Sequence, residues 1–213
     1  MVQPVQIESE DRDEKERAII QAARTVFLSN GFDGASMDTI ALKANVSKRT
    51  VYNRFKSKEA LFGASIEETC RRILPVDVEA AVASTTSRAL VKNLSRAFLQ
   101  AIFHEEAIAL RRIATFEASR KPELGRTYLE NGLYYMVSAA SAIVVRMQSQ
   151  GIVREAPADR VVYHLGALIT EPLYSELLLG VEIEDQSKAL EDQLEMGLDA
   201  FWRLYGTDLD SNK

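Results

Sequence analysis

The chain has 213 residues, of which 46% are hydrophobic and 27% are charged, and its formal net charge is −5. These totals are ordinary for a globular protein of one or two domains, and they argue against a protein that coats nucleic acid with its whole surface. The single cysteine excludes an internal disulfide framework and a multi-cysteine zinc site.

The N-terminal segment is acidic and polar and lacks the apolar run that a signal peptide needs. The longest apolar stretches, such as residues 137–145, fall well short of the roughly 20 residues required to cross a bilayer. We therefore expect a cytoplasmic protein that has no contact with the membrane. Residues 1–12 show no periodicity, which predicts a mobile acidic tail.

The first helical pattern begins at about Glu14. Five apolar residues at helical spacing define its inner face, namely Ile19, Ala22, Ala23, Val26 and Phe27. Asn30 and Gly31 are predicted to end this helix, because glycine and, less readily, asparagine adopt the left-handed backbone conformation at a helix C-terminus.

Two short helices are predicted next, over residues 37–44 and 48–55. Ser36 and Ser47 precede them and can cap their N-termini. Asn45 lies between the two helices and can adopt the positive φ of a tight turn at modest cost. The apolar residues predicted to face inward on these helices are Ile40, Ala41, Ala44, Val51 and Phe55.

A fourth helix is predicted over residues 58–74, with Ser57 as its cap, Pro75 at its end, and Leu61, Phe62 and Ile66 facing inward. No strand-like alternation follows, and further helical segments lie near residues 78–103, 105–119, 122–150, 157–180 and 187–205. Pro172 lies inside one of them and predicts a kink, whose purpose the sequence does not suggest. The chain is therefore expected to be all-α, with about nine helices.

A cluster of six basic side chains with no acidic one extends from Lys43 to Lys58, in a chain that is acidic overall. Ala41, Asn45 and Val51 have the spacing of a helix-turn-helix: a small residue at the crossing, a turn residue and an apolar contact. The second helix then exposes side chains of the types that bind base edges in a major groove: Ser47, Lys48, Arg49, Thr50, Asn53 and Arg54. An ordinary hairpin with a solvated basic face would explain the charges, but not the turn, the caps and these residue types together.

The sequence SMDTIALKANVSKRTVYNRFKSKEALF, residues 36–62, is similar to the DNA-binding domain of TetR-type transcriptional repressors. The similarity to that domain extends over about residues 14–62. Asn45 and Arg49 stand where the family commonly has glycine. Asparagine tolerates the turn conformation, whereas a long guanidinium can bind a guanine edge bidentately or hold a phosphate, and both roles remain open.

The resemblance implies that Ser36, Tyr52 and Lys58 contact the DNA backbone. Lys58 begins the fourth helix, where its charge favours a phosphate. Lys48, Arg49, Thr50 and Asn53 are the candidates for contacts to bases or close to them. Ser47 completes the predicted DNA-binding set.

Three parts are expected in the chain: the tail, a helix-turn-helix domain over residues 13–62 whose fourth helix continues to residue 74 as a connector, and a ligand-sensing and dimerisation domain over residues 75–213. In the larger domain, LRRIATFEASRKPELGRTYLENG, residues 110–132, resembles the AefR-like subgroup of the family. Regulators of this type hold a small ligand between the helices of that domain, and pockets are mostly apolar. The candidate pocket residues are Phe98, Phe103, Phe116, Tyr134, Met136, Met147, Tyr163, His164 and Tyr174.

One recognition helix per chain requires two chains to bind a palindrome. The last two long helical segments are the candidate dimer interface, since a pair of helices from each chain can form a four-helix bundle. Its candidate residues are Val161, Leu165, Leu168, Leu173, Leu190, Leu194, Leu198 and Phe201. The alternative is that these apolar residues only pack within their own domain.

The expected function is a ligand-responsive transcriptional regulator, most simply a repressor that binds a palindromic operator as a homodimer and is released by a small apolar or amphipathic effector. No cofactor, metal or enzymatic activity is expected. An activator or dual regulator of the same fold remains open. Two remote alternatives are an interaction module without DNA binding and an enzyme; residues 103–106 resemble the start of a zinc-protease motif, but Ile108 replaces its second histidine.

Overall fold

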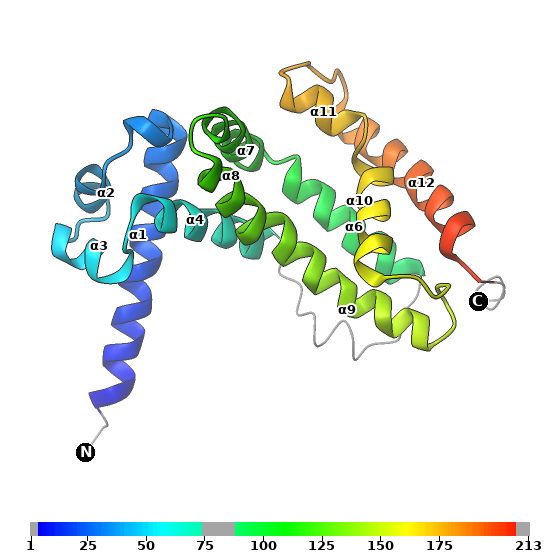
Figure 1. Cartoon of the computed structure of the whole chain (residues 1–213), viewed down its shortest axis with the longest axis horizontal. Helices are drawn as coiled ribbons and strands as arrows, with labels where there is room; N and C mark the ends of the chain where they lie inside the picture. Colours follow the sequence, from blue (N-terminus) through cyan, green and yellow to red (C-terminus); the bar gives the residue numbers. More distant parts are fainter. Residues whose placement is uncertain (1–3, 74–87, 208–213) are drawn as a thin grey trace. The chain divides into compact units, whose positions relative to one another are not determined.

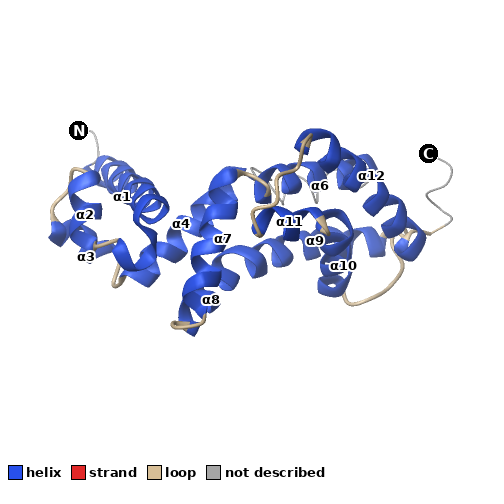
Figure 2. Ribbon diagram, turned by 90° about the horizontal axis from the view of Figure 1, so that it is seen from above, coloured by secondary structure: helices blue, strands red, loops and turns tan. Residues whose placement is uncertain are grey.

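The computed structural model of the chain describes residues 4–73 and 88–207. Within these residues all regular secondary structure is helical, apart from one isolated bridge between Val153 and Gly206 (Figure 2). The expected all-α fold is confirmed. No helix in the described part of the chain is long and apolar enough to cross a membrane.

The chain forms two compact units. The first unit comprises residues 1–69 and 109–132, and the second comprises residues 70–108 and 133–213. This division differs from the single boundary expected near Pro75, because residues 109–132 belong to the first unit. Pro75 itself, and the start of the helix expected at residue 78, lie outside the described residues.

The first unit contains α1 (Pro4–Gly34), α2 (Met37–Lys43), α3 (Lys48–Arg54), most of α4 (Lys58–Ile73), most of α7 (Glu105–Ala118), α8 (Pro122–Tyr128) and most of the π-helical stretch η1 (Leu129–Tyr134) (Figure 1). Helix α1 extends back to Pro4, where a mobile tail was expected. Once a helix has formed over its buried face, each added residue costs little, so the helix propagates beyond that face. At the other end, Gly31 leaves helical geometry with φ 70°, as predicted.

The core of the first unit is built around three phenylalanine rings. Phe27 and Phe62 are in edge-to-face contact with their centroids 5.2 Å apart, and Phe32 lies 5.8 Å from Phe27 and 5.5 Å from Phe62. The inner faces predicted from periodicity are confirmed, since the following residues are all buried: Ile19, Ala22, Ala23, Val26, Ile40, Ala41, Val51, Phe55, Leu61 and Ile66. Ala44 is only half-buried.

Segment 109–132 packs directly on α4 and on the end of α1. A Cβ added to Gly63 of α4 would lie only 2.9 Å from the side-chain nitrogen of Asn131 and 3.0 Å from Thr127. The Lys121 ammonium forms an ion pair with Asp33, at the end of α1, and this bond lowers the pKa of Asp33. A segment distant in sequence therefore completes the first unit.

The second unit contains α6 (Arg88–Ile102), α9 (Tyr135–Ser149), α10 (Ala158–Thr170), α11 (Leu173–Leu178) and α12 (Gln186–Tyr205). The helix expected over residues 122–150 is divided into α8, η1 and α9, and the one expected over residues 157–180 is divided at Pro172 into α10 and α11. A kink was predicted at Pro172, but the interruption is complete: α10 ends at Thr170 and α11 begins at Leu173.

Helix α12 is held between α6 and α10. On the α6 side, Arg96 forms two hydrogen bonds with Glu191, at 2.6 and 3.1 Å, which raise the pKa of Arg96 and lower that of Glu191. On the α10 side, Gln193 Nε2 donates to the Leu168 carbonyl at 2.7 Å, and Gly197 allows the two backbones to approach closely.

Replacing Gly197 by alanine is expected to lower the free energy of unfolding by about 1–3 kcal/mol, the usual cost of overpacking. The added Cβ would lie 2.5 Å from the Leu168 carbonyl oxygen and 2.8 Å from Ile169, so a helix backbone must move. Denaturant unfolding followed by fluorescence of the single tryptophan, Trp202 of α12, measures the effect.

Gly166 provides the matched control for this substitution. It lies inside α10, and a Cβ added there meets no atom within 4 Å. Gly166→Ala should therefore raise the stability by about 0.5–1 kcal/mol, through the helix preference of alanine alone. Equal stabilisation by both substitutions would show that α10 and α12 are not in close contact at Gly197.

Candidate nucleic-acid interface

Two serine caps fix the starts of α2 and α3. The Ser36 hydroxyl accepts a hydrogen bond from the Thr39 backbone N–H, and the Ser47 hydroxyl accepts one from the Thr50 N–H, both at 3.0 Å. The hydroxyls of Ser47 and Thr50 also bond to each other at 2.7 Å. Both predicted caps are confirmed, and each satisfies a backbone donor that a helix start otherwise leaves free.

The turn between the two helices depends on Asn45. Its φ is 55°, the left-handed conformation predicted from the sequence. The turn is closed by backbone hydrogen bonds from the Asn45 N–H to the Leu42 carbonyl, at 3.1 Å, and from the Val46 N–H to the Ala41 carbonyl, at 3.0 Å. Below the turn, fully buried Val51 holds α3 against the core.

Two basic residues of α3 are paired within the protein. Lys48 bonds to Asp38 of α2 at 2.7 Å, and this bond raises the pKa of Lys48. Arg54 bonds to Glu16 of α1 at 3.1 Å and is mostly buried. The expectation that Arg54 lies exposed beside the other polar residues is therefore wrong: it braces α3 against α1.

Lys58 has a structural role at the start of α4. Its ammonium donates to the carbonyl oxygens of Phe32, at 2.7 Å, and Ala35, at 2.9 Å, and lies 4.5 Å from the centroid of the Phe32 ring. These bonds satisfy carbonyls at the end of α1. An ammonium has three donors, so at most one is left for a phosphate. The DNA contact by Lys58 remains a prediction.

Lys58→Met keeps the apolar stem but removes the ammonium, so it should lower the free energy of unfolding by about 1–3 kcal/mol through the unsatisfied carbonyls. Denaturant unfolding without DNA measures this loss. Lys56→Met is the control, because Lys56 is exposed, and its effect should stay within about 0.5 kcal/mol. The opposite result would be unchanged stability together with a weaker salt dependence of DNA binding, in which the slope of log affinity against log salt concentration falls by about one. It would show that Lys58 contacts a phosphate.

Besides Lys48, which is exposed but paired with Asp38, the exposed polar side chains of α3 are Arg49, Tyr52 and Asn53. Arg49 and Asn53 are four residues apart and therefore lie on the same helix face. Guanidinium, carboxamide and phenol groups on one exposed face can form hydrogen bonds with base edges and phosphates. This arrangement is that of a recognition helix, which a capped turn places on the surface of a packed three-helix core.

Comparison with known proteins agrees with this geometry. Residues 19–64 match the family described as bacterial regulatory proteins, tetR family. Residues 89–207, more than half of the chain, match the AefR-like transcriptional repressor C-terminal domain. The chain is a TetR-family transcriptional regulator. As a member of this family it is a DNA-binding protein and not an enzyme.

Solved structures of similar proteins cover nearly the whole regulator. A putative TetR-family regulator from Mesorhizobium loti has 28% identity and a TM-score of 0.78, over 92% of this chain and 98% of that one. The flavonoid-responsive regulator FrrA has 28% identity and a TM-score of 0.71, over 91% and 98%. The transcriptional activator FasR of Mycolicibacterium smegmatis is 32% identical over 44% of this chain, a match that spans only 43% of FasR.

The predicted ligand-pocket residues do not converge on one cavity. Phe103 and Met147 are buried in the core of the second unit, and Phe98, Met136, Tyr163 and Tyr174 are half-buried there. Tyr134 and His164 are exposed, and Phe116 is an exposed residue of the first unit. Aromatic and methionine side chains at helical spacing often fill a close-packed core, and four of the nine do so: Phe103 and Met147 are core residues, and Phe98 and Tyr174 pack against them.

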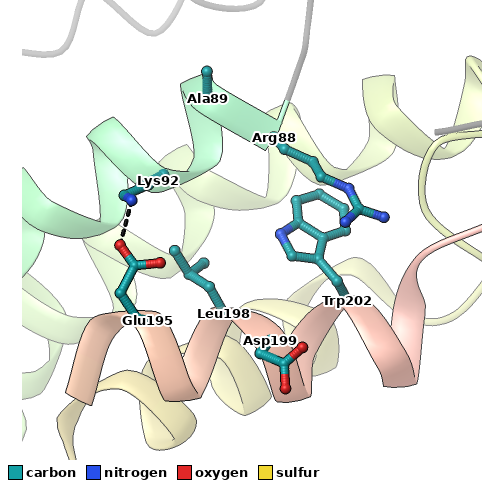
Figure 3. Close-up of a pocket in the computed structure, with 7 residues that line it drawn as sticks. All are labelled: Arg88, Ala89, Lys92, Glu195, Leu198, Asp199 and Trp202. Atoms are coloured by element: carbon teal, nitrogen blue, oxygen red, sulfur yellow. Dashed lines mark ion pairs between the residues drawn. The ribbon is translucent and has the colours of Figure 1, made fainter. Parts of the chain in front are cut away.

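One cavity of the second unit, of about 250 Å³, lies between α6 and α12. Figure 3 shows the Arg88 guanidinium beside the Trp202 indole, with their centres 4.8 Å apart, and the ion pair of Lys92 with Glu195. None of the predicted pocket residues lines this cavity. It is also smaller than the roughly 300–1,000 Å³ of most ligand pockets.

A second cavity, of about 490 Å³, lies in the first unit between the end of α1 and α7. Phe116 lines it, together with Arg112 and Arg120. Glu117 also lines this cavity; it is buried and accepts a hydrogen bond from Arg120 at 3.1 Å.

Half of the predicted dimer residues are buried within their own chain. Val161, Leu194, Leu198 and Phe201 form the core of the second unit, so a partner chain cannot reach them in this conformation. Leu165, Leu168, Leu173 and Leu190 are half-buried and stay candidates. The sequence pattern marks the apolar face of each helix but does not say which neighbour covers it.

Two acidic residues outside α3 determine which of its basic side chains are paired. Asp38 and Glu16 pair with Lys48 and Arg54, and neither acidic residue carries a signal in the sequence that names its partner. The exposed apolar residues of α12, Met196 and Leu204, were also missed, because they lie off the main apolar face.

Proposed function

We propose that the regulator binds a palindromic operator as a homodimer, and that a small apolar or amphipathic effector bound by the second unit releases it. The observation that carries this proposal is the exposed face of α3, with Arg49 and Asn53 free of partners among the described residues. Lys48, Thr50, Ser36, Ser47 and Tyr52 surround that face and supply contacts to the DNA backbone. Because operator DNA lies in the bacterial cytoplasm, the regulator acts there.

The dimer surface is an exposed apolar stripe along α12. Met196, Ala200 and Leu204 recur every four residues, and Met196 and Leu204 are 63% and 55% exposed. Helix α10 lies beside α12 (Figure 1) and contributes exposed Ala167 and His164, whose ring bonds to Tyr205 of α12. Two such helices from each chain can form a four-helix bundle and bring two recognition helices to one palindrome.

Release by an effector is supported by the similarity to FrrA over nearly the whole chain, since FrrA is named for its response to a flavonoid. The effector acts by binding the two states of the dimer unequally, with a typical coupling of about 1–3 kcal/mol. Segment 109–132 provides a route for that coupling, because it continues from helices of the second unit and packs within the first.

Repression is the simpler mode of regulation, because the C-terminal region matches a domain described as belonging to repressors. Activation is the second candidate, since FasR is named as an activator. The position of the operator relative to the promoter decides between the two.

The test is a gel shift of the full chain with the DNA upstream of its own gene, at low and physiological salt, with and without a flavonoid. We expect a saturable complex that survives random competitor DNA and weakens when the flavonoid is added. No complex at low salt would overturn DNA binding. A stable complex that the flavonoid does not weaken would overturn that effector class and leave operator binding intact.

A further inference from the structure

Intramolecular contacts remove several side chains of α3 from base recognition. Lys48 is held by Asp38 at 2.7 Å, and Arg54 is held by Glu16 at 3.1 Å. Val51 is fully buried. These residues position the helix, and a base could engage Lys48 only at the expense of its ion pair.

The hydroxyl groups at the start of α3 are also engaged. Ser47 accepts the Thr50 backbone N–H at 3.0 Å, and the two hydroxyls bond to each other at 2.7 Å. Losing this cap would destabilise the helix start that presents the recognition face. Among the residues that the structure describes, Arg49, Tyr52 and Asn53 are therefore the exposed side chains of α3 that make no hydrogen bond within the chain.

Arg49 and Asn53 form a pair on one helix face. Four residues of α-helix rise about 6 Å, which is less than two base-pair steps of about 3.4 Å. Both side chains can therefore reach base pairs that are neighbours or one step further apart. Tyr52 has a single hydroxyl and cannot make a bidentate contact, which assigns it to a phosphate.

The chemistry of the pair specifies the bases. A guanidinium donates two parallel hydrogen bonds to O6 and N7 of guanine, and a carboxamide bonds bidentately to N6 and N7 of adenine. We infer that each half-site contains a guanine bound by Arg49 and an adenine bound by Asn53, within about two base-pair steps of each other. This inference rests on the proposed operator binding. Lys48 adds affinity without reading sequence.

The experiment selects sites from a random DNA pool with the wild-type full chain and then measures binding to every single-base variant of the best half-site at fixed salt. The same panel is measured with Arg49→Ala, Asn53→Ala and Lys48→Ala. Thermal unfolding of each variant controls for folding. Arg49→Ala and Asn53→Ala should leave the melting temperature unchanged, because both side chains are exposed.

We expect the Arg49 variant to lose discrimination at the guanine only, and the Asn53 variant at the adenine only, each by about 5- to 150-fold. Lys48→Ala should weaken binding to all sequences alike. The inference is overturned if the selected sites lack this pair of bases, or if the Arg49 and Asn53 variants weaken every site equally. If the wild type selects no sequence at all, the proposed operator binding fails with it.

Discussion

Met196→Asp is expected to separate the dimer into monomers and to lower the affinity for a palindromic operator by about 100-fold or more. The substitution places a charge on the most exposed residue of the apolar stripe of α12, and burying an unpaired carboxylate in an interface is costly. Affinity falls steeply because a dimer binds its second half-site at high effective concentration, an advantage of about 10²–10⁴ that a monomer lacks.

Light scattering at micromolar concentration measures the association state, and titration of palindromic and single half-site duplexes at one salt concentration measures the affinity. The affinity for a single half-site should not change, because the recognition helix is untouched. Val145→Asp is the matched control: Val145 is 55% exposed, but on α9, outside the stripe. If the Met196 variant stays dimeric, or if the Val145 variant dissociates to the same extent, the proposal that α12 forms the dimer interface is wrong.

Phe62→Ala is expected to lower the stability of the first unit by about 3–5 kcal/mol. Phe62 is fully buried and contacts both Phe27 and Phe32, so its removal leaves a cavity where α4 meets the end of α1. A typical protein has only about 5–15 kcal/mol of stability, so a loss of this size unfolds a substantial fraction of the molecules on warming. Operator binding should then fail at a lower temperature than in the wild type.

Hydrogen exchange resolved by peptide tests this prediction, because protection of the amides of α2 and α3 reports the opening of the first unit. Phe116→Ala is the control. It makes the same chemical change in the same unit at a side chain that is 69% exposed and lies 4.7 Å from the Arg120 guanidinium, so its cost should stay below about 1 kcal/mol. Equal losses for the two variants would contradict the role of the phenylalanine cluster.

The candidate DNA interface was largely predictable from the sequence, because its determinants are local. Caps at Ser36 and Ser47 act over three residues, and the positive φ of Asn45 depends on the residue itself and its neighbours. Helical periodicity also identified the buried faces of the first four helices. Side chains at a spacing of about 3.6 residues lie on one face, and the apolar face of each helix turns toward the core.

The candidate pocket and the dimer surface were not predictable in the same way. Periodicity shows that Leu194 and Leu198 share an apolar face. A domain core and a dimer interface both require an apolar face, so the pattern cannot distinguish them. The two residues proved to be core, and the exposed large apolar residues of α12 are Met196 and Leu204, which periodicity does not single out. Aromatic composition likewise suggested a pocket, whereas Phe103 lies in the core, Phe98 and Tyr174 pack against it, and Phe116, Tyr134 and His164 are exposed.

The sequence by itself determined the all-α fold, the helix-turn-helix and the family, because these follow from short-range patterns of apolar spacing, caps and turn residues. Only the tertiary structure decided which polar side chains of the predicted DNA-binding set are already paired within the protein. Lys48 and Lys58 had similar standing as DNA contacts in the sequence, yet one is bound to Asp38 and the other to two carbonyls at the end of α1. Arg49 and Asn53 are exposed and are the proposed base contacts, whereas Lys48 and Arg54 of the same helix are paired with acidic residues of α2 and α1, and such pairing depends on the packing of the helices.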